Sequence, residues 1–571
     1  MLRSLVLVCA AALVVGAGSM MADTPQSRPI TGRSQVATRL GIVAASQPLA
    51  AAAGVQVLER GGNAVDAAIA ANAAIGLMEP TSNGIGGDLF ALVYDAKSGT
   101  LHGLNASGWA PRGLTREFLA GRGFTELPSR GAFTVTVPGV VAGWHALREK
   151  FGRLPFADSL APAIHYATEG FPVSEVTAGH WAASVGMLSA EPNAAGTFLI
   201  DGRAPKPAQV FRNPDLARTL SGIAARGRDG FYRGPTAEAI VAILTERGSP
   251  ITADDLSEFE AEWVQPISTT YRGWTVSEIP PNGQGIAALI MLNLMETFPM
   301  DDFGFHSPQA LHTMIEAKKL AYADLLRYVG DPRMSQVPVP AMLDKARASE
   351  RVKLIDPRSA QCRVQPSQLE RVTDMQGHDT IYLSVVDRDG NMVSLIQSNY
   401  QGFGSGLVPS GSGFMLHNRG ALFTLRPGAP NTLAGRKRPL HTIIPGFMEK
   451  HGTRISFGIM GGWNQAQAHA QFVSDVADYG FTAQEALEAG RFTKATFDGC
   501  DVQIEPLVPE RVRDALSAMG HQVYLVPPRS YEFGYGQATV SKPDGVHLGA
   551  SDPRHDGAAI PEAPAVFSTP R

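Results

Sequence analysis

The sequence predicts a protein of mixed helix and strand, of the α/β or α+β class. Helical and extended patterns alternate through the first two-thirds of the chain, which is typical of that class. Two strand-like runs, 380–387 and 392–396, are joined by a turn and predict a β-hairpin further on. The 571 residues, 44% of them hydrophobic, can bury a large core and exceed what one simple compact unit needs.

Residues 1–22 have the composition of a cleaved export signal. Arg3 supplies the early positive charge, residues 5–15 form an apolar run, and small residues follow it. The run is shorter than the ~20 residues that span a bilayer, and no later stretch is long and apolar enough to do so. We therefore expect a periplasmic or secreted protein without stable membrane insertion. Cys9 is not preceded by the small residue that a lipoprotein signal needs, so no lipid anchor is expected.

Two alanine-rich segments, 48–60 and 64–78, carry apolar residues at helical spacing. Gly61-Gly62-Asn63 separates them, and such a cluster is typical of a tight joint. The small side chains of the second segment allow close packing, so we expect both helices to be scaffold. Further helical patterns cover 141–171 and 307–330.

A glycine-rich segment runs from Glu79 to Asp88 and leads into a strand-like run at 89–94. Glycines permit positive φ angles and close backbone approach, so this segment is either a structural turn or the wall of a site. A phosphate-binding loop is the rival interpretation. It would require Gly-Lys-Ser or Gly-Lys-Thr to follow, and neither does.

The approach to the hairpin is polar. Residues 363–376 carry Arg, Gln and Ser with little apolar content, which fits either a solvated loop or a self-cleaving approach to a new N-terminus. Thr380 then stands at the first position of the predicted hairpin. A β-branched residue at a strand start is ordinarily structural, so Thr380 alone does not indicate catalysis.

The charge balance excludes several kinds of partner. A formal net charge of −4 gives no field that would gather nucleic acid or an anionic membrane surface. Removal of the signal leaves Cys362 and Cys500, with no metal-ligand or redox spacing near either. One disulfide is compatible with an oxidising compartment, but we favour two unpaired buried thiols.

Short motifs spread along nearly the whole mature chain change the interpretation of Thr380. They are Gly61-Gly62-Asn63 with Asp66, Glu79-Pro80 with Gly84 and Gly86-Gly87, Val137-Pro138-Gly139, Glu316-Ala317-Lys318, Gly330-Asp331-Pro332, Thr380 with Ser384 and Asp387, Phe403-Gly404, Gly461-Gly462, and Ser551-Asp552-Pro553. In these motifs, and in their order, the sequence resembles the γ-glutamyltransferase family.

The resemblance implies a four-layer αββα sandwich of the N-terminal-nucleophile hydrolase type. It also implies one precursor that cuts itself between Asp379 and Thr380 into a large subunit, 23–379, and a small subunit, 380–571. Thr380 would then be the nucleophile, and its new α-amine, with a pKa of roughly 7.7–8.0, could act as the general base.

Further catalytic roles follow from the same resemblance. The backbone amides of Gly461 and Gly462 would form the oxyanion hole, although a plain glycine turn after a strand is the alternative. Ser398 stands where the family places a second hydroxyl that is hydrogen-bonded to the nucleophile.

The substrate-binding positions depart from the family pattern. Ser107 occupies the place of an arginine, and His441-Thr442 replace a serine pair. Ala421-Leu422 replace an acidic pair. Tyr400, beside Asn399, stands where the family has an asparagine.

Because these changes remove the counter-charges of an amino-acid substrate, glutathione should bind poorly. Arg419 could compensate for an anion, with a surface arginine as the alternative. The expected function is cleavage of γ-glutamyl or related amide bonds. The alternatives are an amidohydrolase of oxamate-like amides, a glutaryl or cephalosporin acylase, and an inactive binding protein.

The partners that we expect are a small amide substrate and the two subunits of the same precursor, while dimerisation of the αβ unit is left open. No cofactor is expected, because the chain itself supplies nucleophile, base and oxyanion donors. No metal is expected either, because His378, His417, His441 and His469 are dispersed without ligand spacing.

Overall fold

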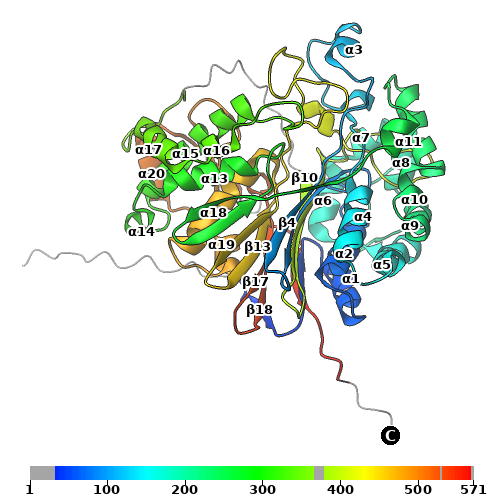
Figure 1. Ribbon diagram of the computed structural model, residues 1–571, viewed down its shortest axis with the longest axis horizontal. Helices are drawn as coiled ribbons and strands as arrows, with labels where there is room; N and C mark the ends of the chain where they lie inside the picture. The colour runs from blue at the N-terminus through cyan, green and yellow to red at the C-terminus, as the bar shows by residue number, and fades with distance from the viewer. Residues whose placement is uncertain (1–31, 365–378, 528–529, 567–571) are drawn as a thin grey trace, which may run out of the picture.

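Two seven-stranded antiparallel sheets pack face to face, and each carries helices on its outer side (Figure 1). The computed structural model describes residues 32–364, 379–527 and 530–566. The layers are therefore helix, sheet, sheet, helix, which confirms the αββα sandwich. The expected signal at 1–22, most of the polar segment 363–376 and His378 lie outside the described residues. Among the described helices, none has the length and apolar character needed to cross a membrane.

The first sheet has the strand order β1-β18-β17-β13-β12-β9-β8. Its strands are β1 (Val36–Thr38), β18 (His547–Ser551), β17 (Gly536–Ser541), β13 (Thr453–Ile459), β12 (Gly446–Lys450), β9 (Trp274–Glu278) and β8 (Ile267–Tyr271). Helices α13 (Gly285–Met295), α18 (Gln465–Ala477) and α19 (Ala483–Glu488) contact this sheet, and α15 (Pro308–Tyr328) packs on α13. The expected helix at 307–330 is confirmed as α15.

The second sheet has the order β19-β2-β10-β11-β3-β4-β7. Its strands are β19 (Ala558–Pro561), β2 (Ile42–Ala45), β10 (Asp379–Val386), β11 (Met392–Tyr400), β3 (Asp88–Asp95), β4 (Thr100–Ala106) and β7 (Glu262–Val264). Helices α1 (Pro48–Glu59), α2 (Ala64–Met78) and α4 (Val140–Phe151) cover its outer face. Both alanine-rich helices, the strand after the glycine segment and the hairpin are confirmed.

The remaining α-helices and strands lie outside the two large sheets and the helices already described. The helices are α3 (Arg116–Ala120), α5 (Phe156–Glu169), α6 (Glu175–Ala183), α7 (Val185–Ser189), α8 (Pro192–Phe198), α9 (Pro214–Arg226), α10 (Asp229–Tyr232), α11 (Pro235–Glu246), α12 (Ala253–Ser257), α14 (Met300–Phe303), α16 (Val339–Met342), α17 (Lys345–Arg351) and α20 (Glu510–Ala518). The strands are β5 (Phe171–Pro172), β6 (Val210–Phe211), β14 (Phe492–Thr493), β15 (Asp501–Ile504) and β16 (Gln522–Leu525). The helical pattern at 141–171 is thus two helices, α4 and α5.

Local sequence explains why α2 begins where it does. The Asn63 side chain accepts hydrogen bonds from the backbone of Val65 and Asp66, and Asp66 accepts one from the backbone of Asn63. This reciprocal capping box satisfies backbone donors that the first turn of a helix leaves unpaired. Almost every residue of α2 is buried, and its alanines let it lie close against β10 and β11.

Strand β10 lies at the centre of the sandwich. Its odd residues, Ile381, Leu383 and Val385, belong to the core shared with α1 and α2. Its even residues Tyr382 and Val386 belong to the core shared with the first sheet. Since side chains alternate along a strand, Thr380 belongs to the face that is directed at the first sheet.

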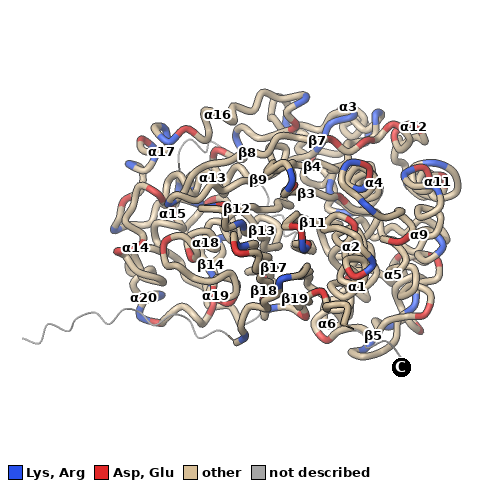
Figure 2. Tube along the Cα trace, turned by 60° about the horizontal axis from the view of Figure 1, so that its bottom comes forward, with Lys and Arg blue, Asp and Glu red and all other residues tan. Residues whose placement is uncertain are grey.

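The expectation of two unpaired thiols is wrong, because Cys362 and Cys500 form a disulfide. The spacing of 138 residues gave no sign of this pairing, which the fold creates by bringing the two segments together. Positive and negative residues are interspersed along the trace in the view of Figure 2, in keeping with the small net charge.

Candidate active site

Thr380 lies near the start of β10 and is 1% exposed. Its hydroxyl donates a hydrogen bond of 3.1 Å to Ser398 Oγ. The Ser398 hydroxyl in turn donates one of 2.7 Å to the carbonyl oxygen of Asp379. One serine side chain therefore touches both the candidate nucleophile and the carbonyl that the nucleophile would attack.

An irregularity in the hairpin brings Ser398 to this position. Asp379 pairs with Tyr400 and Ile381 with Gln397, so that β11 contains one residue more than β10 between these pairs. Such bulges redirect side chains out of the regular ladder. The backbone N–H of Tyr400 donates to Ser398 Oγ at 2.7 Å and holds the serine in place.

The glycine pair lies in the opposite sheet, just after β13. A Cβ atom added to Gly458 would lie 2.4 Å from the Tyr382 ring, so β13 and β10 are in close contact here. Tyr535 connects the two strand ends: its hydroxyl donates to the Thr380 carbonyl at 3.4 Å, and its own carbonyl accepts from the backbone of Met460 at 3.1 Å. One tyrosine therefore contacts both Thr380 and Met460, the residue just before the glycine pair.

Both glycines have backbone angles that side chains disfavour. The φ angles are 129° at Gly461 and 57° at Gly462, and positive values are natural for glycine. A Cβ atom on Gly461 would also lie 3.3 Å from the side chain of Asn464. Both side-chain amide atoms of Asn464 are buried without a hydrogen-bond partner among the described residues. Asn464 is a candidate site residue that the sequence did not indicate.

Two carboxyl groups in this region have raised pKa values: Asp379, which is partly buried and directly precedes Thr380, and Glu79, which is buried. Burial raises the pKa of Asp379 to about 7, against the opposing effects of the Gly402 backbone N–H and Arg130. Burial also raises the pKa of Glu79 to about 8. Glu79 accepts a 2.8 Å hydrogen bond from Ser46. Both carboxyls are therefore protonated to a large extent near neutral pH.

The glycine-rich segment packs directly against the end of β11. A Cβ atom on Gly87 would lie 2.5 Å from the Ser398 carbonyl oxygen and 2.6 Å from Asn399 Oδ1. The segment is thus both a tight turn and a wall of the site. The side-chain amide atoms of Asn399 have no hydrogen-bond partner among the described residues, so they are free for a ligand.

Arg419 is fully buried, so the surface alternative is wrong. Its Nη1 donates to Thr442 Oγ1 at 2.6 Å, and its guanidinium lies 4.6 Å from the centre of the Tyr400 ring. Burial lowers the pKa of Arg419 to about 10, with Asp88 opposing, so that the group stays charged at neutral pH. Its Nε and Nη2, and the Tyr400 hydroxyl, have no hydrogen-bond partner within the described part of the chain.

Asp88 is the counter-ion of this pocket, and its side chain was not singled out from the sequence. Its Oδ2 lies 3.5 Å from Arg419 Nε, 2.9 Å from His441 Nε2 and 3.3 Å from His417 Nδ1. Burial by itself would raise the pKa of Asp88, but the neighbouring His417 and His441 hold it well below its ordinary value. The only sequence signal was its place at the end of the glycine-rich segment.

The other predicted binding residues have partners within the protein. Burial lowers the pKa of His441 to about 3, and its Nδ1 accepts from the backbone of Ile443 at 3.3 Å. His441 is therefore neutral and supports Asp88 rather than facing an anion. Ser107 Oγ accepts from Asn282 at 3.2 Å. Ala421 and Leu422 are buried and apolar, so neither offers a charge to an ammonium group.

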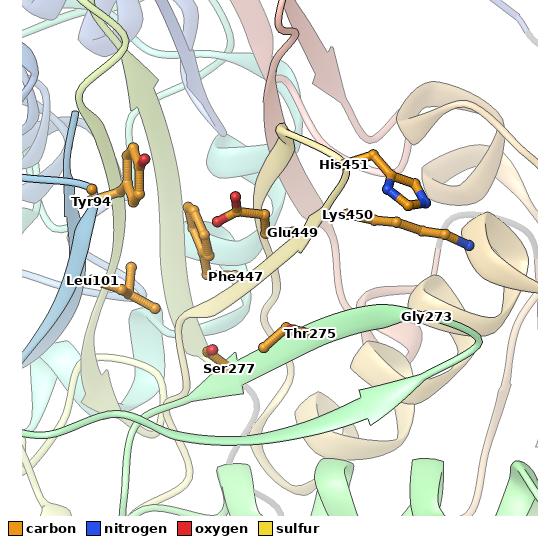
Figure 3. Close-up of a pocket in the computed structure, with 10 residues that line it drawn as sticks. Tyr94, Leu101, Gly273, Thr275, Ser277, Phe447, Glu449, Lys450 and His451 are labelled. Atoms are coloured by element: carbon orange, nitrogen blue, oxygen red, sulfur yellow. The ribbon is translucent and has the colours of Figure 1, made fainter.

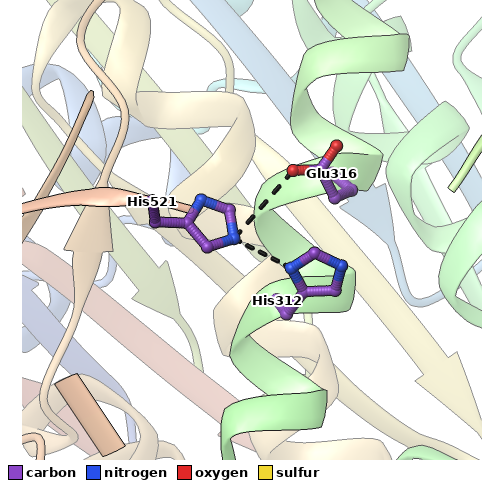
Figure 4. A group of neighbouring side chains, drawn as sticks. All are labelled: His312, Glu316 and His521. Carbon is purple, nitrogen blue, oxygen red and sulfur yellow. Dashed lines mark hydrogen bonds and ion pairs between the residues drawn. The ribbon is translucent and has the colours of Figure 1, made fainter. Parts of the chain in front are cut away.

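Two other features lie apart from this site. The pocket of Figure 3, about 400 Å³, is lined by Tyr94, Phe447 and Lys450 among others. Tyr94 is in register with Met392 and, through it, with Val386, at the end of β10 opposite to Thr380. The second feature is a buried group of His312, Glu316 and His521 whose ligand atoms lie within 4.8 Å of one another (Figure 4). Lys319 Nζ already lies 2.6 Å from Glu316 Oε1, and this cation would compete with a metal ion.

Comparisons with known proteins identify relatives of this chain. A family model described as gamma-glutamyltranspeptidase matches residues 50–562. The chain is 35% identical to the glutathione hydrolase-like YwrD proenzyme of Bacillus subtilis over 90% of this chain and 96% of that protein. It is 34% identical to the oxamate amidohydrolase proenzyme of Klebsiella pneumoniae, over 92% and 99%. The crystal structure of cephalosporin acylase from Bacillus halodurans superposes with a TM-score of 0.84 at 42% identity and covers 94% of this chain and 99% of its own.

Proposed function

The chain belongs to the γ-glutamyltranspeptidase family of enzymes that act on amide bonds, and from that premise we propose that it is a self-processing hydrolase with Thr380 as its nucleophile. The observation that carries the proposal is the Ser398 hydroxyl, which accepts from Thr380 Oγ1 at 3.1 Å and donates to the Asp379 carbonyl at 2.7 Å. A donor on a carbonyl oxygen stabilises the negative charge that develops there during attack.

Self-cleavage needs no group from outside the chain except water. The Thr380 hydroxyl adds to the Asp379 carbonyl carbon and gives up its proton. The bond between carbon and nitrogen then breaks as the nitrogen takes up a proton, which leaves an ester on Thr380 Oγ1. Water hydrolyses this ester, so that Asp379 ends as a carboxylate and Thr380 as a free α-amine. The products are a large subunit, 23–379, and a small subunit, 380–571.

The same residue then serves in turnover. The new α-amine, with a pKa of roughly 7.7–8.0, accepts the hydroxyl proton as the hydroxyl attacks a substrate amide. The backbone amides of Gly461 and Gly462 stabilise the tetrahedral oxyanion, an effect that is worth about 10²–10³ in rate for each donor. The α-amine returns this proton to the leaving amine as the amide bond breaks, which leaves an ester on Thr380 Oγ1. Water or another amine then attacks this ester and releases the acyl group from Thr380.

The buried charges of the pocket favour an acyl group that carries a carboxylate. Arg419 Nη2 has no partner among the described residues, while Arg419 Nε lies 3.5 Å from Asp88 Oδ2, and Asn399 and Tyr400 add further polar atoms without a hydrogen-bond partner there. A buried donor left unpaired costs free energy, so such groups indicate a ligand that pairs with them. No acidic side chain stands at Ala421 or Leu422 to meet an α-ammonium group.

This arrangement favours an amidohydrolase or acylase function over ordinary glutathione cleavage. The candidate substrates are a small carboxylate amide of the oxamate kind and a glutaryl or cephalosporin-type N-acyl compound. Relatives of this chain include an oxamate amidohydrolase and a cephalosporin acylase, which supports both kinds of substrate. An inactive binding protein is the remaining alternative, and the intact set of Thr380, Ser398 and the glycine pair argues against it.

Export is part of the proposal. The disulfide between Cys362 and Cys500 supports it, because such bonds persist in oxidising compartments and are rare in the cytosol. We propose residues 1–22 as the signal that directs the chain there.

The deciding experiment combines processing with turnover. The purified chain is analysed by mass spectrometry and then assayed with glutathione, oxamate and glutaryl amides. Two fragments that meet at Asp379 and Thr380, with hydrolysis of at least one amide, are the expected result. An intact chain, or a processed chain that hydrolyses none of a broad amide panel, contradicts the proposal.

A further inference from the structure

The disulfide joins residues on opposite sides of the proposed cleavage point. Cys362 precedes Thr380 in the chain and Cys500 follows it. We infer that self-cleavage turns this bond into a covalent link between the large and small subunits, so that the mature enzyme is one disulfide-bonded pair. The inference rests on the proposed function, because without cleavage the bond stays within one chain.

The segment around Cys362 is held on the small subunit by backbone contacts as well. The Ala360 N–H donates to the Met519 carbonyl at 2.7 Å, and the Gly499 N–H donates to the Cys362 carbonyl at 2.9 Å. Cys500 is 3% exposed. The disulfide is therefore one part of a larger contact between the end of the large subunit and the 499–519 region of the small subunit.

A histidine pair extends this contact away from the disulfide. His521 of the small subunit lies 2.8 Å from His312 of α15, nitrogen to nitrogen. The other nitrogen of His312 lies 2.8 Å from the Asp356 carbonyl oxygen (Figure 4 shows the pair). Burial lowers the pKa of His521 to about 3, and Lys319 adds to this effect, so His521 is uncharged near neutral pH.

Lys319 and Glu316 of α15 hold the same segment from the large-subunit side. The Lys319 ammonium donates to the Gln361 carbonyl at 3.0 Å, and the Glu316 carboxylate accepts from the Gln361 N–H. Gln361 is the residue just before Cys362. The cysteine is thus fixed by the side chains of α15 on one side and by the backbone of the small subunit on the other.

Cleavage changes what the bond does. In the precursor it closes a loop between residues 138 apart, which restricts the unfolded chain. After cleavage the loop is open, and the bond prevents the two polypeptides from separating. Residues 363–379 become the last 17 residues of the large subunit. They follow Cys362, which stays bonded to Cys500 of the small subunit.

The bond forms by thiol–disulfide exchange. The thiolate of one cysteine attacks a disulfide of an oxidant protein in the exporting compartment, and the second cysteine displaces that protein from the mixed disulfide. Two electrons and two protons pass from the cysteine pair to the oxidant, which leaves as a dithiol. Self-cleavage itself involves no electron transfer, so the two steps are independent.

Electrophoresis in denaturant, with and without reductant, tests the inference. All proteins are exported full-length chains with Cys9→Ala, so that Cys362 and Cys500 are the remaining cysteines. Free thiols are blocked before analysis. We expect one band without reductant and two bands with it, the smaller band being the 192-residue chain 380–571. Cys362→Ser and Cys500→Ser should each give two bands under both conditions.

The outcomes separate the inference from the proposed function. Two bands without reductant would overturn the covalent link while leaving self-cleavage intact. One band under both conditions would overturn self-cleavage, and the link between subunits with it. Thr380→Ala is the reference for that pattern.

A second measurement compares the urea midpoint of unfolding at two protein concentrations. For the linked pair, unfolding is expected not to depend on protein concentration. For processed Cys362→Ser and Cys500→Ser, a tenfold dilution should lower the urea midpoint, because separation of the subunits is then part of unfolding. A midpoint of the disulfide-bonded protein that shifts on dilution as much as those of the variants would contradict the inference.

Discussion

The hydroxyl of Ser398 donates a 2.7 Å hydrogen bond to the carbonyl oxygen of Asp379, the carbonyl that precedes Thr380. This contact crosses from β11 to β10 at the irregular end of the hairpin. In the proposed mechanism this hydroxyl is the oxyanion donor for self-cleavage, and it is separate from the glycine pair that follows β13 of the opposite sheet.

Replacement of Ser398 should slow self-cleavage. We expect Ser398→Ala to lower the rate by about 10², because one donor to the developing oxyanion is lost. Ser398→Thr, which keeps the hydroxyl, should process faster than the alanine variant. The cleaved fraction is followed over time by mass spectrometry. Processing of Ser398→Ala at the unaltered rate would show that the hydrogen bond has no part in cleavage.

Replacement of Thr380 should abolish processing. Thr380→Ala lacks the hydroxyl that attacks Asp379, so we expect an intact chain after prolonged incubation. The unaltered protein should give a small chain of 192 residues, which begins at Thr380 and ends at Arg571. N-terminal sequencing of that chain is the measurement. A different first residue, or cleavage of Thr380→Ala at the same bond, would refute the assignment.

Side chains at the glycine pair should stop turnover without unfolding the protein. Gly462→Val places a side chain at φ 57° and shifts the amide that is assigned to the oxyanion. We expect kcat to fall by about 10² or more. Gly480→Ala is the matched control, since Gly480 also has a positive φ, of 67°, with open space around it. Near-normal kcat for Gly462→Val, or an equal loss in the control, would refute the oxyanion assignment.

Glutathione and γ-glutamyl-p-nitroanilide should be poor substrates compared with an amide that bears a carboxylate but no α-ammonium. Removing the partner of a buried charge costs several kcal/mol, and each ~1.4 kcal/mol is tenfold in kcat/KM. We therefore expect a difference of about 10² or more between the two kinds of substrate. Values of kcat/KM for glutathione, oxamate and glutaryl amides decide the matter, and glutathione at the top would refute the pocket assignment.

The raised pKa of Glu79 should lower the free energy of unfolding as the pH rises. Its pKa is about 8 in the folded state, raised by burial from an ordinary value of 4.5. Between these values the folded state holds a proton that the unfolded state has lost. Stability therefore falls as the pH rises from about 4.5 to 8, at up to about 1.4 kcal/mol per pH unit.

The amide variant Glu79→Gln should remove that part of the pH dependence. Urea midpoints at pH 5 and pH 8 should differ less in Glu79→Gln than in the unaltered protein. Glu126→Gln, on the surface, is the control and should leave the difference unchanged. The same pH dependence in the Glu79 variant and the unaltered protein would contradict the assignment.

The sequence by itself determined the local elements, and it predicted Thr380 as the nucleophile. Helical spacing and the Asn63 cap specify α1 and α2, because a helix depends on residues that are neighbours in the chain. Two strand-like runs and the turn between them predicted the hairpin of β10 and β11. Thr380, Ser398 and the glycine pair were found because family motifs keep their order along the chain.

The tertiary structure alone decided which side chains from distant parts of the chain come into contact. Asp88 and Arg419 are 331 positions apart in the chain, and Cys362 and Cys500 are 138 apart. No periodicity of the sequence encodes such contacts, and the hydropathy of a lone arginine or cysteine does not reveal its burial. Whether Arg419 is a solvated side chain or a charged group in a dry pocket depends on the packing of β3, β11 and the residues around 441. Packing of the two sheets, rather than the local sequence, therefore sets the chemistry that surrounds Thr380.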